Sequence, residues 1–324
     1  MAKAKKKGGK RHIIQLFFAC ITNSFVTGFV GGKIFRGKLK YICHPGLNCY
    51  SCPGALLSCP IGSLQAVLGS RSFLFSTYVF GMILLFGALL GRMVCGFLCP
   101  FGFVQELLYK IPFKKKIKTF KGDKPLRHLK YIVLVVLVIA LPMLLKTSGD
   151  SSPVYCKYLC PAGTLEAGIP HVTYDKLAKP PALVNALPEG SLPTVNLIKG
   201  GVELSQPKLK TGWLFLWKLS ILIVIVLLSI FIYRPFCKYL CPLGAIYGIM
   251  NPVALYRLNF NKDKCISCGI CAKRCNMGID PTKNANSAEC VRCRDCVNAC
   301  PTGALSTSFS LDSLVCKSAE RKGI

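Results

Sequence analysis

The chain is poor in acidic residues, in histidine and in recognisable nucleotide-binding motifs. Its 324 residues include 13 Asp+Glu against 42 Lys+Arg, and four histidines. No flavin or nucleotide fingerprint is visible in the glycine-containing stretches. The histidines all fall outside the long apolar runs, which argues against a haem b held within a membrane; they are His12, His44, His128 and His171.

Cysteines, basic residues and apolar runs are what the chain has in abundance. It is 52% hydrophobic, holds 20 cysteines and carries a formal net charge of +29. The basic residues flank apolar runs instead of interleaving with exposed aromatics, so the pattern favours a membrane-topology signal over nucleic-acid binding. A secreted disulfide scaffold is the alternative explanation of many cysteines, but such scaffolds are short chains with a signal peptide. Iron–sulfur clusters held by thiolates would offset part of the positive charge.

Four apolar stretches predict membrane-spanning helices, so the expected fold class is an all-α polytopic membrane bundle. The first stretch is diluted by polar residues, and the third contains Pro142, a break that helical bundles tolerate. The segment before the first stretch, MAKAKKKGGKRH, shows no small-residue cleavage site, which predicts a retained signal anchor. The four expected spans are Ile13–Gly32, Phe73–Gly91, Tyr131–Leu145 and Trp213–Tyr233.

The spacing C-x2-C-x2-C-x3-C occurs twice after the fourth stretch, in CISCGICAKRC and CVRCRDCVNACP. This is the spacing of bacterial ferredoxins with two 4Fe–4S clusters, in which three thiolates wrap one cluster and the fourth crosses to the other. Zinc is the alternative for CxxC pairs, but two complete runs favour iron–sulfur. One departure is Asn276, which follows Cys275 where proline is usual. The predicted ligands are Cys265, Cys268, Cys271 and Cys300 for cluster 1, and Cys290, Cys293, Cys296 and Cys275 for cluster 2.

The distribution of Lys and Arg predicts that both termini lie in the cytoplasm of a bacterial or archaeal cell, with the chain in the cytoplasmic membrane. Residues 1–12 hold six basic residues and residues 92–130 hold ten, whereas residues 146–211 hold seven balanced by five acids. Residues 33–71 disagree, because they should lie outside yet hold five basic residues and no acid. The expected divisions are a basic N-terminus at 1–12, a membrane domain at 13–255, an α+β ferredoxin-like domain at 256–305 and a tail at 306–324.

A second cysteine motif, C-P-x-G followed by an apolar and a polar or aromatic residue, occurs four times in the membrane half. Proline after the cysteine suits a helix start, and glycine lets the backbone approach a bulky group. Helix-start amides also favour a negatively charged cluster. The hexapeptide CKYLCP appears in two of the four copies. The motifs begin at Cys59, Cys99, Cys160 and Cys241, and three of them have another cysteine four residues upstream, at Cys95, Cys156 and Cys237.

The expected topology sorts these cysteines onto two faces. Cys95, Cys99, Cys237 and Cys241 follow the second and fourth spans and make the four thiolates of one cytoplasmic-face cluster. On the outer face the best set is Cys52, Cys59, Cys156 and Cys160, with Cys49 close behind, and disulfides are the alternative there. Other candidates carry less weight: Cys43 and His44 are weak ligand candidates, and Cys20 and Cys316 are expected to be ordinary thiols.

The combination of four spans, the motifs CGFLCP and CKYLCP, and a double ferredoxin tail resembles the polyferredoxin-like membrane proteins of the NapH/NosR type. By motif, Cys95, Cys99, Cys237 and Cys241 match the CxxxCP pairs of that family, and the eight tail cysteines match its ferredoxin ligands. The resemblance implies electron transfer between the quinone pool or cytoplasmic carriers and periplasmic or flavin-bearing partners. The run NCYSCP and the third CP motif are not assigned by it.

The leading hypothesis is an electron-transfer subunit with two 4Fe–4S clusters in the tail and one or two more in the membrane domain. Its expected partners are the lipid bilayer and a redox protein such as a ferredoxin or an FMN-bearing subunit, with flavin on the partner alone, no haem and no nucleic acid. Two alternatives stay open: a quinol dehydrogenase using Glu106 or Glu166 as proton acceptor, and a non-redox assembly or regulatory factor. The basic residues between tail ligands either raise cluster potentials and dock an acidic carrier or are solvated face residues; they are Lys273, Arg274, Arg292 and Arg294.

Overall fold

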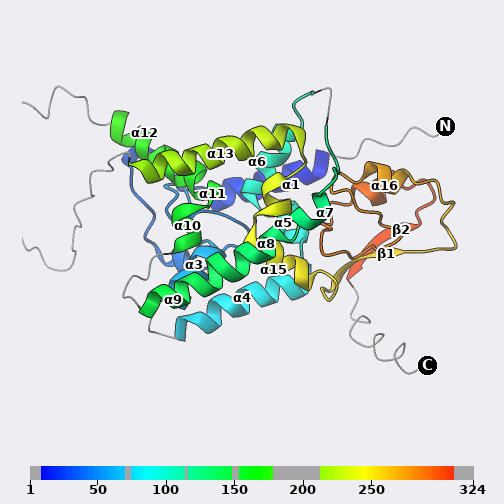
Figure 1. The fold of residues 1–324 in the computed structure, drawn as a ribbon, viewed down its shortest axis with the longest axis horizontal. Helices are drawn as coiled ribbons and strands as arrows, with labels where there is room; N and C mark the ends of the chain where they lie inside the picture. Colours follow the sequence, from blue (N-terminus) through cyan, green and yellow to red (C-terminus); the bar gives the residue numbers. More distant parts are fainter. Residues whose placement is uncertain (1–8, 70–73, 114–115, 148–152, 178–211, 310–324) are drawn as a thin grey trace, which may run out of the picture.

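The computed structural model describes residues 9–69, 74–113, 116–147, 153–177 and 212–309. These ranges form a mostly helical body with a small two-stranded region at one end, as Figure 1 shows. The helices run along the long axis of the body, and the C-terminal region lies beside α7 and the N-terminal end of α1. Cys316 and part of the predicted 1–12 and 306–324 segments lie outside the described residues.

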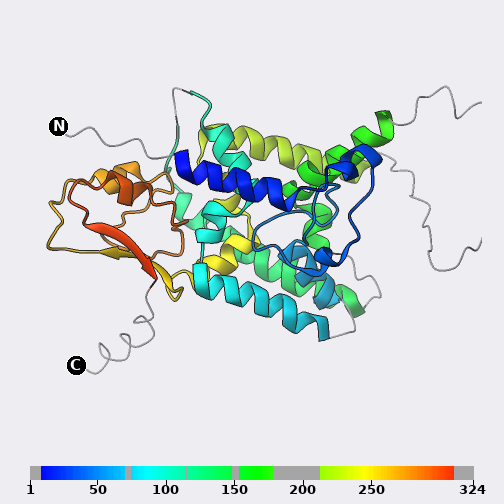
Figure 2. The ribbon, with the colours of Figure 1, turned by 180° about the vertical axis from the view of Figure 1, so that it is seen from behind.

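The first apolar stretch is broken, so the predicted span from Ile13 to Gly32 is not one continuous helix. It forms α1 (Gly9–Thr22) and the short α2 (Val26–Gly31). The helix ends where the Asn23 amide turns back to the Ala19 carbonyl at 3.0 Å, and the Phe25 N–H leaves the helix to bond the Gly54 carbonyl. Seen from behind, α1 lies across the body between α13 and α4 (Figure 2).

Three further apolar stretches form long helical segments. The helix α4 (Leu74–Leu90) is followed later by a continuous run of α7 (Asp123–Leu126), α8 (Leu129–Val133), the π-helical η2 (Leu134–Ala140) and α9 (Leu141–Thr147). The π-helical turn precedes Pro142, which has no N–H to continue the ladder. The fourth stretch is α13 (Trp213–Phe231).

Two of these segments, Asp123–Leu145 and Trp213–Phe231, are long and apolar enough to cross a membrane. The helices at Arg11–Thr22 and Thr77–Leu90 are apolar but shorter. Apolar side chains on the two long segments face outward, as Val135 at 56% exposed and Leu216 at 54% illustrate. An outward apolar surface of this kind suits contact with lipid.

Short helices fill the ends of the body and carry the cysteine motifs. One end holds η1 (Lys38–Tyr41), α3 (Pro60–Gly69), α10 (Val154–Tyr158), α11 (Pro161–Gly163), η3 (Thr164–Gly168) and α12 (Ile169–Leu177). Nearer the C-terminal region are α5 (Met93–Phe97), α6 (Pro100–Tyr109), α14 (Pro235–Tyr239) and α15 (Pro242–Met250).

The C-terminal region pairs β1 (Tyr256–Phe260) with β2 (Leu305–Phe309) in an antiparallel ribbon, with Tyr256 opposite Phe309. Between the strands lie two one-turn helices, α16 (Ile270–Arg274) and α17 (Asp295–Ala299). The first strand of this ferredoxin-like region begins at Tyr256, and its last strand ends at Phe309.

Candidate iron–sulfur sites

The CP motifs share one local geometry in which the cysteine sulfur caps the helix that its proline begins. The glycine N–H three residues on donates to the sulfur, from Gly102 to Cys99 at 3.4 Å and from Gly244 to Cys241 at 3.3 Å. The Cys160 motif repeats this bond at 3.4 Å. Each capping cysteine is extended and each proline occupies the first helical turn. The turn therefore gives each of these sulfurs a backbone N–H donor, which favours a negatively charged thiolate or cluster ligand.

Two glutamines of the CP motifs make matching hydrogen bonds to Cys156 and Cys237, the cysteines four residues before a CP cysteine. The motif includes this polar position, but the sequence alone does not predict its role. Gln105 donates from Nε2 to the Cys237 sulfur at 3.3 Å and accepts from the Phe236 N–H at 3.1 Å. Gln65 makes the same pair of bonds, to the Cys156 sulfur at 3.4 Å and from the Tyr155 N–H at 2.9 Å. Each glutamine stands six residues after a CP cysteine, at the polar position of the repeat.

The inner set consists of Cys95, Cys99, Cys237 and Cys241, which come from α5, the start of α6, α14 and the start of α15. All four are buried, and each thiol interacts electrostatically with others of the set. Two guanidinium groups stand beside them: Arg92 donates to the Cys237 carbonyl at 3.1 Å, and Arg234 donates to the Cys95 carbonyl.

The surroundings of the inner set fit a 4Fe–4S cluster. Arg92 and Arg234 are completely buried, and the Nε of each has no hydrogen-bond partner among the described residues. Buried cationic donors without partners are costly unless a negative group lies near them. Four thiolates around a cubane provide such a group.

The outer set that the structure brings together is Cys49, Cys59, Cys156 and Cys160. A Cβ placed on Gly163 would lie 3.6 Å from the Cys49 sulfur and 3.9 Å from the Cys160 sulfur. The Gly62 position is likewise 3.8 Å from the Cys156 sulfur. The two CPxG glycines thus line a cradle into which these sulfurs project, and the four thiols interact electrostatically with one another.

Cys52 lies apart from this set, so the geometry favours Cys49 over the predicted Cys52. The Cys52 sulfur is 3.7 Å from the Asn23 side-chain oxygen. The backbone N–H of Cys49 donates to the Glu166 carboxylate at 2.6 Å, which positions Cys49 at the outer set. The backbone N–H of Cys52 donates to the Cys49 carbonyl and so forms the next turn. Burial raises the pKa of Glu166 to about 8, although the Cys49 N–H favours its ionised form.

The eight tail cysteines line two separate cavities. Cys265, Cys268, Cys271 and Cys300 line one cavity of about 390 Å³, and Cys275, Cys290, Cys293 and Cys296 line another. Corresponding positions of the two loops are left-handed: Ser267 and Arg292 have φ of 52° and 51°, and Gly269 and Arg294 have φ of 67° and 65°. Three of these four residues carry a side chain, which marks a backbone held against its preference at a functional turn.

One buried loop, residues 43–49, extends from the inner set to the outer set. Its Leu47 N–H bonds the Cys99 sulfur, its Pro45 carbonyl accepts from the Tyr247 hydroxyl at 2.8 Å, and Cys49 belongs to the outer set. Gly46 packs so closely that its Cβ position lies 2.9 Å from the Cys99 Cα. His44 is 1% exposed in this loop; its Nδ1 accepts from the Gly46 N–H, and its Nε2 has no partner among the described residues.

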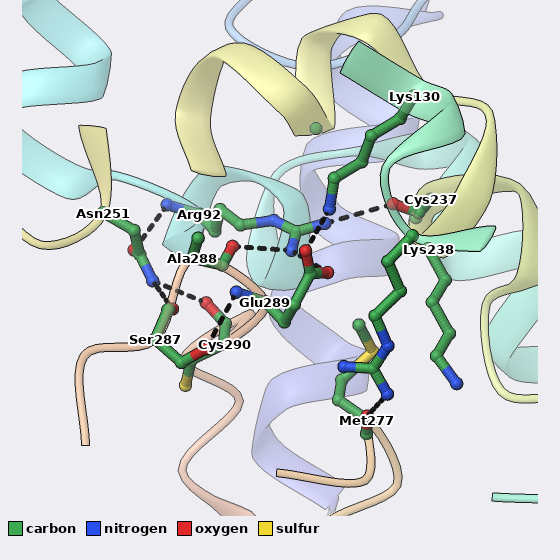
Figure 3. A network of polar contacts seen from close by, with 12 residues as sticks. Arg92, Lys130, Cys237, Lys238, Asn251, Met277, Ser287, Ala288, Glu289 and Cys290 are labelled. Atoms are coloured by element: carbon green, nitrogen blue, oxygen red, sulfur yellow. Dashed lines mark hydrogen bonds and ion pairs between the residues drawn. The ribbon is translucent and has the colours of Figure 1, made fainter. Parts of the chain in front are cut away.

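The ferredoxin-like region is fastened to the inner set by a buried polar network (Figure 3). Arg92 donates to the Ala288 carbonyl at 2.8 Å and to Glu289 at 3.0 Å, and Lys130 pairs with the same carboxylate at 2.5 Å. Asn251 joins the two sides, accepting from the Arg92 N–H and donating to the Cys290 carbonyl at 3.0 Å. Burial raises the pKa of Glu289, but Arg92 and Lys130 outweigh it and hold that pKa below its usual value.

The remaining predicted residues take structural or peripheral positions. Glu106 is enclosed by Arg11 at 3.1 Å, Arg234 at 2.9 Å and the Tyr233 hydroxyl, so its carboxylate is fully engaged. Among the basic tail residues Arg292 is buried and donates to the Leu90 carbonyl at 3.2 Å, whereas Lys273, Arg274 and Arg294 are exposed. Cys20 is exposed and Cys43 is buried.

The described cysteines are all free thiols, including those for which disulfides were the alternative. Within the described ranges, no three His, Cys, Asp or Glu side chains converge closely enough to hold a single metal ion. The thiols of the outer set and of the two tail sets instead line cavities.

Comparisons with known proteins agree with this chemistry. One family described as a 4Fe-4S binding domain matches residues 73–119, 129–169 and 214–262, and a second family of the same description matches residues 285–306. No solved structure matches the chain.

Several curated proteins are similar to the chain. The uncharacterized protein MJ0750 of Methanocaldococcus jannaschii is 29% identical over 71% of this chain and 77% of its own length. The putative electron transport protein YccM of Escherichia coli is 25% identical over 52% of each chain. The regulatory protein NosR of Stutzerimonas stutzeri is 26% identical over 66% of this chain and 24% of its own. Its 4Fe-4S binding domains and these relatives support a polyferredoxin-like protein of the NosR/YccM type.

Proposed function

We propose that the protein is a membrane-bound electron-transfer subunit in which four sets of four cysteines each hold a 4Fe–4S cluster. The clusters supply one-electron redox chemistry, and the protein sets their order and environment. The order along the body is cluster 1, cluster 2, the inner set and the outer set. The direction of electron flow in the proposal is from a cytoplasmic carrier towards a membrane or extracytoplasmic acceptor.

The observation that carries this proposal is the continuity of buried structure between successive sets. Cys290 of cluster 2 precedes Val291, whose carbonyl packs against Gly96, the neighbour of Cys95 in the inner set. The loop 43–49 then joins the inner set to Cys49. Tyr155, completely buried, interacts electrostatically with Cys241 of the inner set and with cysteines of the outer set.

The residues around each set supply different electrostatic environments. Arg92 and Arg234 face the inner set, where positive charge and buried N–H groups favour the more negative, reduced state of a cluster. Gln65 and Lys218 serve the outer set, Lys218 through a 3.1 Å bond to the Cys156 carbonyl. Such hydrogen bonds to sulfur and nearby charges are the means by which proteins adjust cluster potentials.

The proposed membrane placement keeps four crossings, with both termini in the cytoplasm. It is supported by the two long apolar helices, by the apolar α1 and α4, and by the positive charge of residues 92–130 next to the ferredoxin-like region. The inner and outer sets then lie towards opposite faces of the membrane.

Iron analysis and EPR on anaerobically purified, full-length protein test the proposal. About sixteen iron atoms per chain and four distinguishable reduced clusters are the expected result. About eight iron atoms, with signals assigned to the tail alone, would overturn the four-set assignment.

A second candidate function, quinol oxidation, is favoured by a cavity beside the outer set. It measures about 1110 Å³ and is lined by the four outer cysteines and by apolar residues such as Leu47, Ala66 and Val67. Pockets for cofactor-sized ligands fall at about 300–1,000 Å³, so the cavity has room beyond a cluster. Reduction of the clusters by menaquinol in detergent-solubilised protein would support this function, and reduction by a soluble carrier alone would count against it.

A further inference from the structure

A groove rich in basic residues lies where the ferredoxin-like region meets the membrane half. It measures about 720 Å³, and its cationic wall is formed by residues from the end of α6, the segment that follows it, and α16. We call this feature the basic groove and define it by Lys110, Lys116, Lys118, Lys273 and Arg274.

A hydrogen bond from a lysine side chain to a backbone carbonyl joins the two walls of the basic groove. Lys118 donates to the Lys273 carbonyl at 2.5 Å, and Lys116 donates to the Tyr109 carbonyl at 2.5 Å while lying 4.4 Å from the centre of the Tyr109 ring. Outside the lining of the groove, Arg127 also joins the two parts of the chain by donating to the Met277 carbonyl at 3.0 Å. These contacts fix the groove as one surface made from two parts of the chain.

The positive charge of the basic groove is not neutralised within the described protein. None of its five cations forms an ion pair with a described carboxylate, and all five are exposed. The carboxylate that lines the groove, Asp295, faces Arg11 at 3.8 Å. Like charges gathered in a concave surface create a positive potential that attracts a negatively charged partner.

The groove also reaches the chain that carries the ligands of cluster 2. Asn276 directly follows Cys275, and Asp295 directly precedes Cys296; both residues line the groove. Cluster 1 lies elsewhere, in the cavity lined by Cys265 and Cys300. A partner seated in the groove therefore approaches cluster 2, the cluster placed nearest the inner set.

We infer that the basic groove is the docking site for the acidic surface of a small one-electron carrier protein of the ferredoxin or flavodoxin class. The inference rests on the proposed electron-transfer function. On docking, the reduced carrier gives up one electron and is oxidised, and cluster 2 takes that electron and is reduced; no bond is made or broken.

A protein surface suits the groove better than a small anion. Its lysines are exposed and extended along two walls instead of converging on one buried point, and exposed ammonium groups give long-range attraction with weak, rapidly reversible contacts. Electron-transfer complexes are of this kind, with small interfaces and high association rates.

The inference is tested by measuring the affinity of an acidic two-cluster ferredoxin for the full-length, cluster-loaded protein in detergent. The variant Lys116→Glu/Arg274→Glu should weaken association on the order of tenfold or more at low salt, and the difference from wild type should shrink as salt is raised. Carbodiimide cross-linking of the wild-type complex should join carrier carboxylates to Lys110, Lys116, Lys118 or Lys273.

Two further variants distinguish the outcomes. Lys283→Glu, an exposed charge reversal elsewhere on the ferredoxin-like region, should bind the carrier as wild type does. If Lys262→Glu, beside the cavity of cluster 1, weakens association while Lys116→Glu/Arg274→Glu does not, the carrier docks at cluster 1 and the inference is wrong. Competition by millimolar inorganic phosphate at constant ionic strength would indicate a small-anion site and also overturn it.

The same samples keep this inference separate from the proposed function. Reduced methyl viologen, a cation that the groove does not attract, should reduce the clusters of wild type and of Lys116→Glu/Arg274→Glu equally. If it reduces the tail but not the membrane sets, the proposed electron path fails, whatever the carrier binding shows.

Discussion

Gly96 and Val291 touch so closely that a Cβ built on Gly96 would overlap the Val291 carbonyl oxygen. Gly96 follows an inner-set cysteine in α5, and Val291 follows the first cysteine of cluster 2. The contact brings the backbones of two ligand-bearing segments together, with Arg92 and Asn251 bonding across the same junction. The absence of a side chain at position 96 is what permits this approach.

Gly96→Ala should therefore loosen the junction while leaving the tail clusters assembled. We expect magnetic coupling between cluster 2 and the inner cluster to weaken in the EPR spectrum of the reduced protein. Gly81→Ala is the matched control, because nothing lies within 4 Å of a Cβ at that helical position. An unchanged coupling in Gly96→Ala would show that the contact does not set the distance between the two sites.

Cys49→Ala should remove the outer cluster, whereas Cys52→Ala should retain it. The reason is that the Cys49 sulfur projects into the Gly163 cradle and the Cys52 sulfur lies against Asn23. Iron content should fall by about four atoms per chain in the first variant and stay at the wild-type value in the second. The reverse result would restore Cys52 as the ligand.

Gln105→Leu and Gln65→Leu should each lower the reduction potential of one cluster. Each substitution removes an N–H donor to a cysteine sulfur, and such donors stabilise the more negative reduced state. A bond worth about 1 kcal/mol corresponds to roughly 40 mV for one electron. Redox titration followed by EPR should show the shift in the inner cluster for Gln105→Leu and in the outer cluster for Gln65→Leu. Each variant is the control of the other, and a shift in the tail clusters would contradict the assignment.

Glu289→Gln should weaken the attachment of the ferredoxin-like region by about 3–5 kcal/mol, because it leaves Arg92 and Lys130 buried without their carboxylate. Amide hydrogen exchange around Asn251 and Ala288 should become faster at neutral pH. Asp263→Asn, at an exposed position of the same region, should leave exchange there as it is in wild type. Unchanged protection in Glu289→Gln would mean that the ion pairs do not hold the junction.

The sequence was most informative where ligands are close along the chain. In the tail, the spacing from Cys265 to Cys300 limits which thiols can meet, and the cysteines line two cavities. The pairing of Cys95 and Cys99 with Cys237 and Cys241 rests on counting apolar stretches, which is a coarser argument, and it stays a prediction.

Other features depend on contacts that no local pattern contains. Glu166, more than a hundred residues away, positions Cys49 instead of Cys52 at the outer set by accepting a hydrogen bond from the Cys49 N–H. The end of α1 at Thr22 depends on the Gly54 carbonyl, which takes the Phe25 N–H out of the helix. The junction network around Glu289 joins residues from four distant segments of the chain, so no local sequence pattern contains it.

The loop 43–49 has a consequence for how the protein is made. Because Leu47 and Cys49 serve different sets, this loop cannot settle until the chain has supplied both Cys160 and Cys241. The outer set is complete in the growing chain before the inner set, and the inner set before the tail, whose cysteines are the last to be synthesised. The two membrane sites are therefore linked through this loop and depend on long-range contacts, whereas the tail can form from its own short stretch of sequence.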